Sequence, residues 1–364
     1  MAVLTTRPGI MDMAPYVPGA SKIEGVDPII KLSSNEGALG PSPMAVEAYK
    51  EISGDLHRYP DGASVELRAA IGARHGLDSD RIVCGAGSDE VLGLLAKAYA
   101  GPGDEVLFGE HAFIMYPLFA LAVGAVPVKA PETDFTLSVD GLLDKVTDKT
   151  RIVYVANPNN PTGTMVTQHE MKRLRRGLRE DILLVIDAAY AEYVTRNDYS
   201  PGIELVDAGE NVVMTRTFSK IYALGGVRLG WAYCPAVIAD VLNRIRPPFN
   251  VTSAAQAAGI AAVNDIEFLT RSRDHNTAWL PWLSERLEEI GLEVVPSAGN
   301  FVLVRFPTEG PHTADAAMAS LTARGIIPRG TASAGISDGI RITVGLEDEM
   351  RLTADALSEF MVGT

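Results

Sequence analysis

The sequence predicts an α/β fold in which a mostly parallel central sheet is flanked by helices and joined to a smaller α+β domain. Short apolar segments, such as residues 151–158 and 182–187, alternate with helical patterns through the first two thirds of the chain. Strands that are apolar on both faces are typical of a parallel sheet covered by helices. The pattern changes near residue 265, and 364 residues are enough for two domains.

The first part of the chain supplies the elements of the large sheet. Residues 1–34 are rich in proline and glycine and predict an extended arm that leads into a short strand at 29–34. A helix is expected at 88–100 because Ser-Asp-Glu gives it an acidic first turn. Apolar runs predict strands at 81–87, 105–110, 125–131, 151–158, 182–187, 211–217 and 229–235. Helical patterns occur at 43–53, 64–75, 116–124 and 168–179.

The remaining residues predict a smaller unit. Its expected elements are a long helix ending near 291, strands at 293–297, 300–306 and 339–345, and helices at 313–324 and 347–361. We therefore expect a large domain over residues 35–264 and a small domain over 265–364, joined by the arm 1–34. The connection between the two domains is expected at 265–280.

Charge and composition narrow the classes of partner. The chain has 32 lysines and arginines against 46 aspartates and glutamates, a net charge of −14, which disfavours nucleic-acid binding. The basic run at 172–179 is typical of a solvated helix face. Neither a signal peptide nor a membrane span is expected. Cys84 and Cys234 lie in apolar segments outside any C-x-x-C motif, which favours buried thiols in a reducing cytoplasm. No metal site is predicted.

Two motifs follow apolar strands. Residues 157–164, Asn-Pro-Asn-Asn-Pro-Thr-Gly-Thr, predict a rigid turn after the strand at 151–158. Asp187 ends the apolar run 182–187, and Tyr190 follows three residues later. Taken alone, each motif fits an ordinary turn or cap, but a carboxylate after a buried strand is costly unless it is paired. Ligands bind at these carboxyl ends in open α/β sheets.

A lysine with unusual neighbours follows the strand at 211–217. Lys220 comes after Thr217 and Ser219, and Arg228 lies eight residues further on. Hydroxyls and a guanidinium together suit a phosphate. The segment Gly-Ala-Gly-Ser-Asp-Glu, which ends at Glu90, indicates a second anion-binding element, since it exposes backbone amides at the positive end of a helix.

These motifs together predict one cofactor. They supply a phosphate site, a carboxylate that needs a cation, polar groups of Asn160 and Tyr190 for an oxygen, and the amine of Lys220 for a carbonyl. Pyridoxal 5′-phosphate has a phosphate, a ring nitrogen that can be protonated, a ring hydroxyl and an aldehyde that joins a lysine amine. The expected cofactor is therefore pyridoxal 5′-phosphate, attached to Lys220.

The order and spacing of the motifs resemble the fold-type I pyridoxal-phosphate enzymes, the aspartate aminotransferase superfamily. The matching motifs are Asn-Pro-Thr-Gly at 160–163, Asp-x-x-Tyr at 187–190, Thr-x-Ser-Lys at 217–220, Arg228 and Arg-Ile-Thr-Val-Gly at 341–345. Within the superfamily the chain is most similar to the histidinol-phosphate aminotransferases and their aromatic aminotransferase relatives. The segments that carry this closer similarity are 57–62, 85–90 and 225–233.

The resemblance implies a role for each matching residue. Lys220 would form the aldimine with the cofactor and move a proton, while Asp187 would keep the ring nitrogen protonated. Asn160 and Tyr190 would contact the ring oxygen, and Phe113 would stack on the ring. The residues implied to hold the phosphate are Gly87, Ser88, Asp89, Thr217, Ser219, Arg228 and, reaching across a homodimer with shared active sites, Tyr59.

The resemblance also implies a ping-pong amino transfer from histidinol phosphate to 2-oxoglutarate. Arg341 would bind a substrate carboxylate. Arg329 is the candidate for binding the phosphate of the donor, with Tyr16 as a helper, and a solvated surface arginine is the alternative. Asn35 would border the substrate. Two segments depart from the pattern of the histidinol-phosphate enzymes, which often have Asn-Glu-Asn-Pro-Leu-Gly at residues 35–40 and Val-Arg-Pro at 328–330.

Other activities on the same scaffold stay open at this point. An aromatic amino acid (Phe/Tyr) aminotransferase would use the same cofactor set. A pyridoxal-phosphate-dependent amino acid phosphate decarboxylase would release CO₂ without forming a keto acid. A cofactor-binding regulatory domain fused to a DNA-binding module is disfavoured, since no basic winged-helix segment precedes residue 30.

Overall fold

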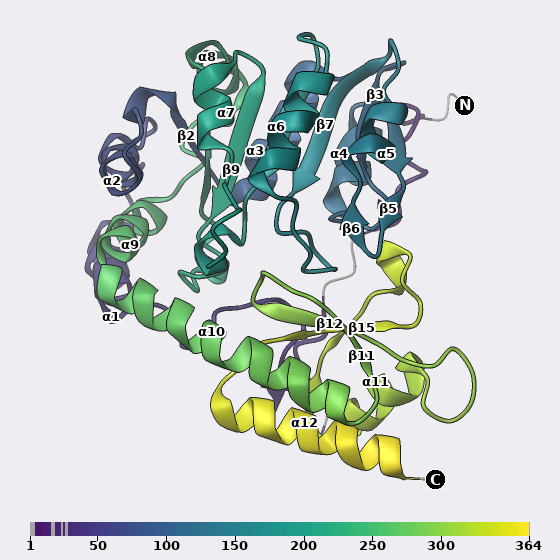
Figure 1. Cartoon of the computed structure of the whole chain (residues 1–364). Helices are drawn as coiled ribbons and strands as arrows, with labels where there is room; N and C mark the ends of the chain where they lie inside the picture. Colours follow the sequence, from purple (N-terminus) through teal and green to yellow (C-terminus); the bar gives the residue numbers. More distant parts are fainter. Residues whose placement is uncertain (1–3, 16–18, 23–24, 26–27, 364) are drawn as a thin grey trace.

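The computed structural model describes residues 4–15, 19–22, 25 and 28–363. A seven-stranded sheet forms the centre of its large unit, in the order β2-β10-β9-β8-β7-β3-β4, and only β10 runs antiparallel to its neighbours. This confirms the predicted α/β class with a mostly parallel sheet (Figure 1). The strands are β2 (Ile82–Gly85), β3 (Glu105–Gly109), β4 (Val126–Ala130), β7 (Thr150–Ala156), β8 (Leu183–Asp187), β9 (Val212–Thr217) and β10 (Gly230–Tyr233).

The central strands are buried on both faces because their alternate side chains enter two separate cores. In β8, Leu184 and Ile186 belong to one core, whereas Leu183 and Val185 belong to the other. Helices α3 (Ser88–Tyr99), α4 (Met115–Ala122) and α8 (Ala236–Ile245) cover one face. The helices on the other face are α2 (Val65–His75), α5 (Val139–Asp144), α6 (Gln168–Gly177), α7 (Ile203–Ala208) and α9 (Ser253–Asn264), with α1 (Pro43–Glu51) packed on α9.

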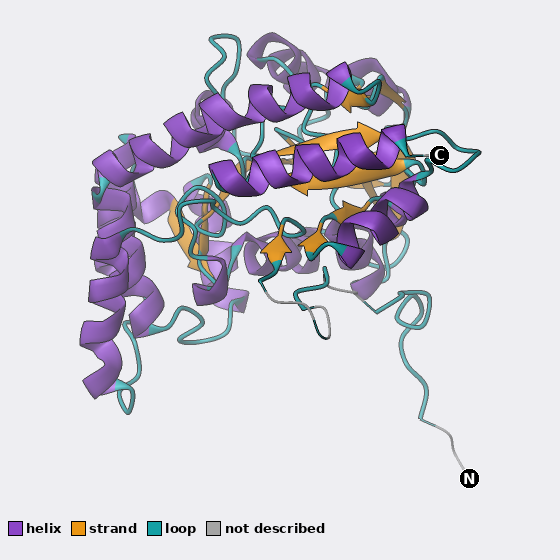
Figure 2. Ribbon diagram, turned by 90° about the horizontal axis from the view of Figure 1, so that it is seen from below, coloured by secondary structure: helices purple, strands orange, loops and turns teal. Residues whose placement is uncertain are grey.

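A second, antiparallel sheet forms the smaller unit. Its order is β11 (Glu293–Val295), β12 (Phe301–Arg305), β15 (Gly339–Thr343) and β14 (Arg329–Gly330). Helices α10 (Ile266–Glu289), α11 (Ala314–Ala323) and α12 (Glu347–Val362) share its core. Seen from below, α10 and α12 run side by side across this sheet (Figure 2).

Two short pairings complete the topology. Strand β1 (Ile30–Lys31) pairs in parallel with β13 (Ile326–Ile327), so the end of the N-terminal arm is attached to the smaller unit. Strands β5 (Glu132–Thr133) and β6 (Thr136–Leu137) form a hairpin. The division into domains at 264/265 stays a prediction, although α10 begins at Ile266 and the second sheet follows it.

Several elements differ from the sequence-based expectation. The expected connection at 265–280 is part of the continuous helix α10. Helices α8 and α9 had no counterpart in the prediction; α9 consists largely of alanine and other small residues and is buried on several sides, so it lacks a clear amphipathic pattern. The segment 325–330 forms two short strands, β13 and β14, that flank Pro328 and belong to different sheets. In the part of the chain that the structure describes, no helix has the length and apolar character needed to span a bilayer.

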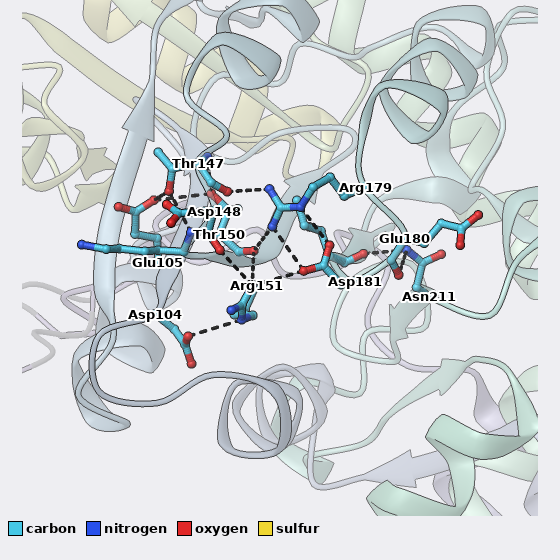
Figure 3. Close-up of polar contacts among 12 residues, drawn as sticks. Asp104, Glu105, Thr147, Asp148, Thr150, Arg151, Arg179, Glu180, Asp181 and Asn211 are labelled. Carbon is cyan, nitrogen blue, oxygen red and sulfur yellow. Dashed lines mark hydrogen bonds and ion pairs between the residues drawn. The ribbon is translucent and has the colours of Figure 1, made fainter.

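The amino ends of the parallel strands carry a network of exposed charges (Figure 3). Arg179 donates hydrogen bonds to the carbonyl oxygens of Thr147 and Thr150, and it pairs with Asp181 at 2.9 Å. Arg151 forms ion pairs with Asp104 at 3.4 Å and with Asp181 at 3.2 Å. This network connects the loops that precede β3, β7 and β8, at the opposite end of the strands from the candidate site.

Candidate active site

The candidate site lies at the carboxyl ends of the parallel strands, where the sequence places its unusual polar residues. The register brings the strand ends together, since Ala156 is opposite Asp187 and Asp187 is opposite Thr215. A pocket of about 240 Å³ opens there. Its wall includes residues of both units, among them Ser34, Phe113, Asn160, Asp187, Lys220, Arg228, Arg329 and Arg341.

Lys220 is a half-buried amine in a turn just beyond β9. Its Nζ donates a hydrogen bond of 3.1 Å to the carbonyl oxygen of Ser34, and it lies 5.7 Å from the centre of the Tyr190 ring. Burial, together with the positive charge of Arg341, lowers the pKa of Lys220 to about 8. A sizeable fraction of the amine is therefore neutral near physiological pH, as a nucleophile or a proton acceptor requires.

Asp187 is a buried carboxylate at the end of β8. The Tyr116 hydroxyl donates a 2.9 Å hydrogen bond to Oδ2, and the Thr215 hydroxyl donates a longer one of 3.4 Å to Oδ1. Burial nevertheless raises the pKa of Asp187 to about 6. Among the residues that the structure describes, no lysine, arginine or histidine forms an ion pair with it. A cationic ring nitrogen would fit this position, because it would compensate the desolvated charge.

The start of α3 and Arg228 form a site suited to an anion. Arg228 Nη1 donates to the Ser219 hydroxyl at 3.4 Å, and Nη2 lies 3.3 Å from Asp89 Oδ2. Gly87 has φ +87°, and a methyl group there would lie only 2.5 Å from Arg228 Nη2. Glycine is thus required for the guanidinium to approach the helix start. Backbone amides at the N-terminus of a helix and a guanidinium both favour a phosphate.

The residues predicted to contact the cofactor ring, Phe113, Asn160 and Tyr190, line the same pocket. The Tyr190 hydroxyl accepts a 2.8 Å hydrogen bond from Asn35 Nδ2, and Asn160 Oδ1 accepts one of 2.6 Å from Arg341 Nη1. Phe113 also lines the pocket. Carboxylate, lysine, aromatic ring and anion site therefore surround one space, and this donor set fits pyridoxal 5′-phosphate.

Two arginines meet on the other side of the pocket. Arg329 in β14 is directly opposite Arg341 in β15, and both line the pocket. Arg341 Nη2 also donates a 2.6 Å hydrogen bond to the carbonyl oxygen of Ser33. Like charges directly opposite one another destabilise a sheet. Two guanidinium groups therefore line the same side of the pocket.

Two further predicted site residues, Tyr59 and Asn35, are not among the residues that line the pocket. Tyr59 is 82% exposed and stacks on Phe249 with ring centres 4.7 Å apart, so a role in a neighbouring subunit stays a prediction. Asn35 is buried behind Tyr190 and is not among the lining residues, so a direct contact with substrate also stays a prediction. Tyr16 lies outside the described residues.

Other site residues were missed by the sequence-based prediction. Tyr116 lies inside the apolar stretch of α4, where nothing signals that its hydroxyl reaches Asp187. Thr215 had a usable signal, because it lies two residues before Thr217 and therefore on the same face of β9. Thr331, Ser333 and Ala334, in the connection between β14 and β15, also line the pocket. Within the described residues, no cluster of three or more histidine, cysteine, aspartate or glutamate side chains could hold a metal ion.

Comparisons with known proteins agree with this geometry. A family model described as aminotransferase class I and II matches residues 27–357. The chain is 60% identical to a histidinol-phosphate aminotransferase of Paramagnetospirillum magneticum over 99% of both chains, and 56% identical to one of Rhodospirillum rubrum, covering 98% of this chain and 97% of that one. The crystal structure of histidinol-phosphate aminotransferase from Sinorhizobium meliloti in complex with pyridoxal-5′-phosphate superposes with a TM-score of 0.86 at 30% identity, covering 91% of this chain and 90% of that one.

Proposed function

The chain belongs to the class I and II aminotransferases, and we propose that it transfers the amino group of histidinol phosphate to 2-oxoglutarate with pyridoxal 5′-phosphate as its cofactor. The observation that carries the choice of substrates is the opposed pair Arg329 and Arg341 on the pocket wall. A donor with a phosphate and an acceptor with carboxylates both need cationic groups on this side. The names of the similar proteins support the same donor.

The two arginines would divide the recognition of the two substrates. Arg341 is held by Asn160 and the Ser33 carbonyl, so its guanidinium is fixed for a carboxylate close to Lys220. Arg329 lies beside the segment that contains Thr331 and Ser333, further along the small sheet. We assign Arg329 to the phosphate of the donor.

The residues around Lys220 and Asp187 perform the chemistry. When bound, pyridoxal phosphate supplies an electron-withdrawing ring that stabilises negative charge at the substrate carbon bearing the amino group. The neutral amine of Lys220 accepts the proton from that carbon, and its lowered pKa keeps the neutral form available. Asp187 would hold the protonated ring nitrogen of the cofactor, because its buried carboxylate would be stabilised by a cationic partner.

The remaining polar groups orient these reactants. Asn35 donates a hydrogen bond to the Tyr190 hydroxyl and so fixes the direction in which that hydroxyl can donate its own proton. The Ser34 carbonyl accepts a hydrogen bond from Lys220 Nζ. This bond holds the amine on the pocket side of the turn.

We also propose that the enzyme is a cytoplasmic homodimer. Large apolar side chains are exposed around the start of the large domain, including Tyr59, Leu56 at 76% and Tyr49 at 49%. A second copy that covers them would bring Tyr59 towards the neighbouring phosphate site. Cys84 and Cys234 are buried free thiols, which suits a reducing compartment.

Single-turnover spectroscopy of the purified holoenzyme tests the proposed donor. Histidinol phosphate and, separately, phenylalanine are added without keto acid, and conversion of the cofactor to its amine form is followed by absorbance. Rapid conversion with histidinol phosphate alone is expected. Rapid conversion with phenylalanine and little with histidinol phosphate would make the enzyme an aromatic aminotransferase, and release of CO₂ would make it a decarboxylase.

A further inference from the structure

A partly buried histidine–glutamate pair lies directly behind one wall of the pocket. His111 immediately precedes Ala112 and Phe113, which line the pocket. Glu132, in β5, accepts a 3.1 Å hydrogen bond from the backbone N–H of His111, and its other oxygen lies 2.9 Å from His111 Nδ1. The side chains are 17% and 3% exposed, respectively. One carboxylate thus fixes both the backbone and the ring of His111.

Phe135 joins this pair to the turn that carries Asn160. Its ring centre lies 5.5 Å from that of His111, and its carbonyl oxygen accepts a 2.7 Å hydrogen bond from the Thr164 hydroxyl. The Thr164 and Thr162 hydroxyls are 2.9 Å apart. Asn159 Nδ2 donates both to Thr162 at 3.0 Å and to the His111 carbonyl at 3.2 Å. The contacts therefore form a closed circuit of residues 111, 159, 162, 164 and 135.

The smaller unit lies next to the same two rings. Phe135 packs on a core formed by Val295, Leu303 and Ile336, and the Arg305 guanidinium lies 5.0 Å from its ring centre. A methyl group built on Gly335 would lie 3.6 Å from His111 Cδ2, an ordinary contact distance. The imidazole therefore lies beside the connection between β14 and β15, in which segment 331–336 lies.

The segment 331–336 is a compact unit that forms part of the pocket wall. The Thr331 hydroxyl donates a 2.8 Å hydrogen bond to the carbonyl of Ile336, and the Gly335 N–H donates a 2.9 Å one to the carbonyl of Ala332. Thr331, Ser333 and Ala334 line the pocket next to Arg329. A shift of this unit would move the wall near Arg329, whereas Arg341 is held independently by Asn160 and Ser33.

We propose that His111 and Phe135 are positioning residues that hold segment 331–336 at the correct distance from Phe113 and so set the width of the pocket for the phosphate-bearing end of the donor. Neither side chain is among the residues that line the pocket. The inference rests on the proposed function. Its consequence is that the two substrates respond differently, because we assign the phosphate of the donor to Arg329 and a carboxylate of the acceptor to Arg341.

Steady-state kinetics of His111→Ala and Phe135→Leu test the proposal. We expect KM for histidinol phosphate to rise about tenfold in each, while kcat and KM for 2-oxoglutarate change by less than about twofold. Glu132→Gln should stay close to the wild type, because an amide can keep both contacts to His111. His169→Ala is the matched control, since His169 forms a similar pair with Glu170 at 3.2 Å but is 78% exposed. Equal changes in KM for both substrates would overturn the proposal.

Hydrogen–deuterium exchange of the same holoenzymes gives a readout that does not depend on turnover. Faster exchange in peptides covering 331–336 is expected in His111→Ala and Phe135→Leu, and no change is expected in His169→Ala. Unchanged exchange at 331–336 in both variants would overturn the proposal. If the wild type itself fails to convert histidinol phosphate, the proposed function fails, and the exchange result alone then decides the positioning role.

Discussion

Asp181, just before strand β8, and Asp187, the last residue of that strand, have opposite electrostatic settings. Asp181 precedes the strand, where hydrogen bonds from the exposed Arg179 hold its pKa below the ordinary value (Figure 3). Asp187 ends the strand, where burial raises its pKa to about 6. The Asp181 carboxylate thus forms an ion pair with an arginine of the chain. The Asp187 carboxylate is buried and would be stabilised by a cationic ligand.

The same contrast holds between the amino ends of the parallel strands, the amino edge, and their carboxyl ends, the carboxyl edge. At the amino edge, Arg151 and Arg179 contact carboxylates and carbonyl oxygens and remain partly exposed. At the carboxyl edge, Lys220 is kept as a weak base by burial and by Arg341. Charges of the first kind stabilise the fold weakly. Buried charges at the carboxyl edge, such as Lys220, lower the stability of the free protein and become favourable when cofactor and substrate bind.

Replacing Lys220 by alanine should have the largest effect at the carboxyl edge. Loss of the covalent attachment and of the proton acceptor should lower the transamination rate by about 10⁴-fold or more. Stability of the cofactor-free protein should not fall, since a partly desolvated amine is removed. Borohydride reduction followed by peptide mass spectrometry should link the cofactor to the Lys220 peptide only in the wild type. Normal turnover in the variant would contradict the assignment of Lys220.

Replacing Asp187 by asparagine should separate activity from stability. We expect the rate to fall by about 10²–10³-fold, because the ring nitrogen loses its anionic partner. In the cofactor-free wild type, the folded state holds the Asp187 proton up to a pKa of about 6, whereas the unfolded state loses it near 3.8. Stability should therefore fall as the pH rises from 4 to 6. Asparagine removes this loss and should stabilise the free protein at pH 7.5 by about 1–3 kcal/mol.

Denaturant unfolding of both cofactor-free proteins at pH 4.5 and 7.5 measures this difference. Asp181→Asn is the matched control just before the same strand, and its effect has the opposite sign. The folded pKa of Asp181 is depressed, so its stabilisation is present above the unfolded pKa and is lost as the pH falls through the folded one. A wild type that is equally stable at both pH values relative to Asp187→Asn would contradict the account of Asp187.

Arg329→Ala tests the division of the two arginines. KM for histidinol phosphate should rise about 10- to 100-fold, since a charge-assisted contact to phosphate is lost, while KM for 2-oxoglutarate should change little. Arg341→Ala should affect 2-oxoglutarate instead. It should also raise the pKa of Lys220, because Arg341 is one of the charges that lower it. The two variants are compared by initial rates with each substrate varied in turn.

The sequence predicted Asp187 and Lys220 at the carboxyl edge, but it did not predict the residues that hydrogen-bond to them, for a physical reason. Asp187 and Lys220 break a local pattern, since each is a charged group next to a buried apolar strand. Their partners have no such signal: Tyr116 reaches Asp187 from 71 residues away, and Ser34 reaches Lys220 from 186 residues away. Such contacts depend on tertiary packing and leave no periodicity in the sequence.

The fold shows the same limit. The buried strands were predictable because each is a continuous apolar run, whereas α9 was not, since a helix of small residues buried on several sides has no polar face. The register that sets Arg329 against Arg341 depends on β14, a strand of two residues. Gly335, where an added methyl group would lie 3.6 Å from His111 Cδ2, is in a loop 224 residues away in the sequence, outside the reach of any local pattern.

Arg179→Ala should have the smallest effect on activity and tests whether the charges at the amino edge serve only stability. The variant loses hydrogen bonds to the carbonyls of Thr147 and Thr150, and a net loss of about 0.5–1.5 kcal/mol in the free energy of unfolding is expected. Activity should remain within about twofold of the wild type, because the network lies at the opposite end of the strands from the pocket. Denaturant unfolding and initial rates on the same preparation check both. A large loss of activity with unchanged stability would mean that the amino edge takes part in function, and the division of charges between the two edges would then be wrong.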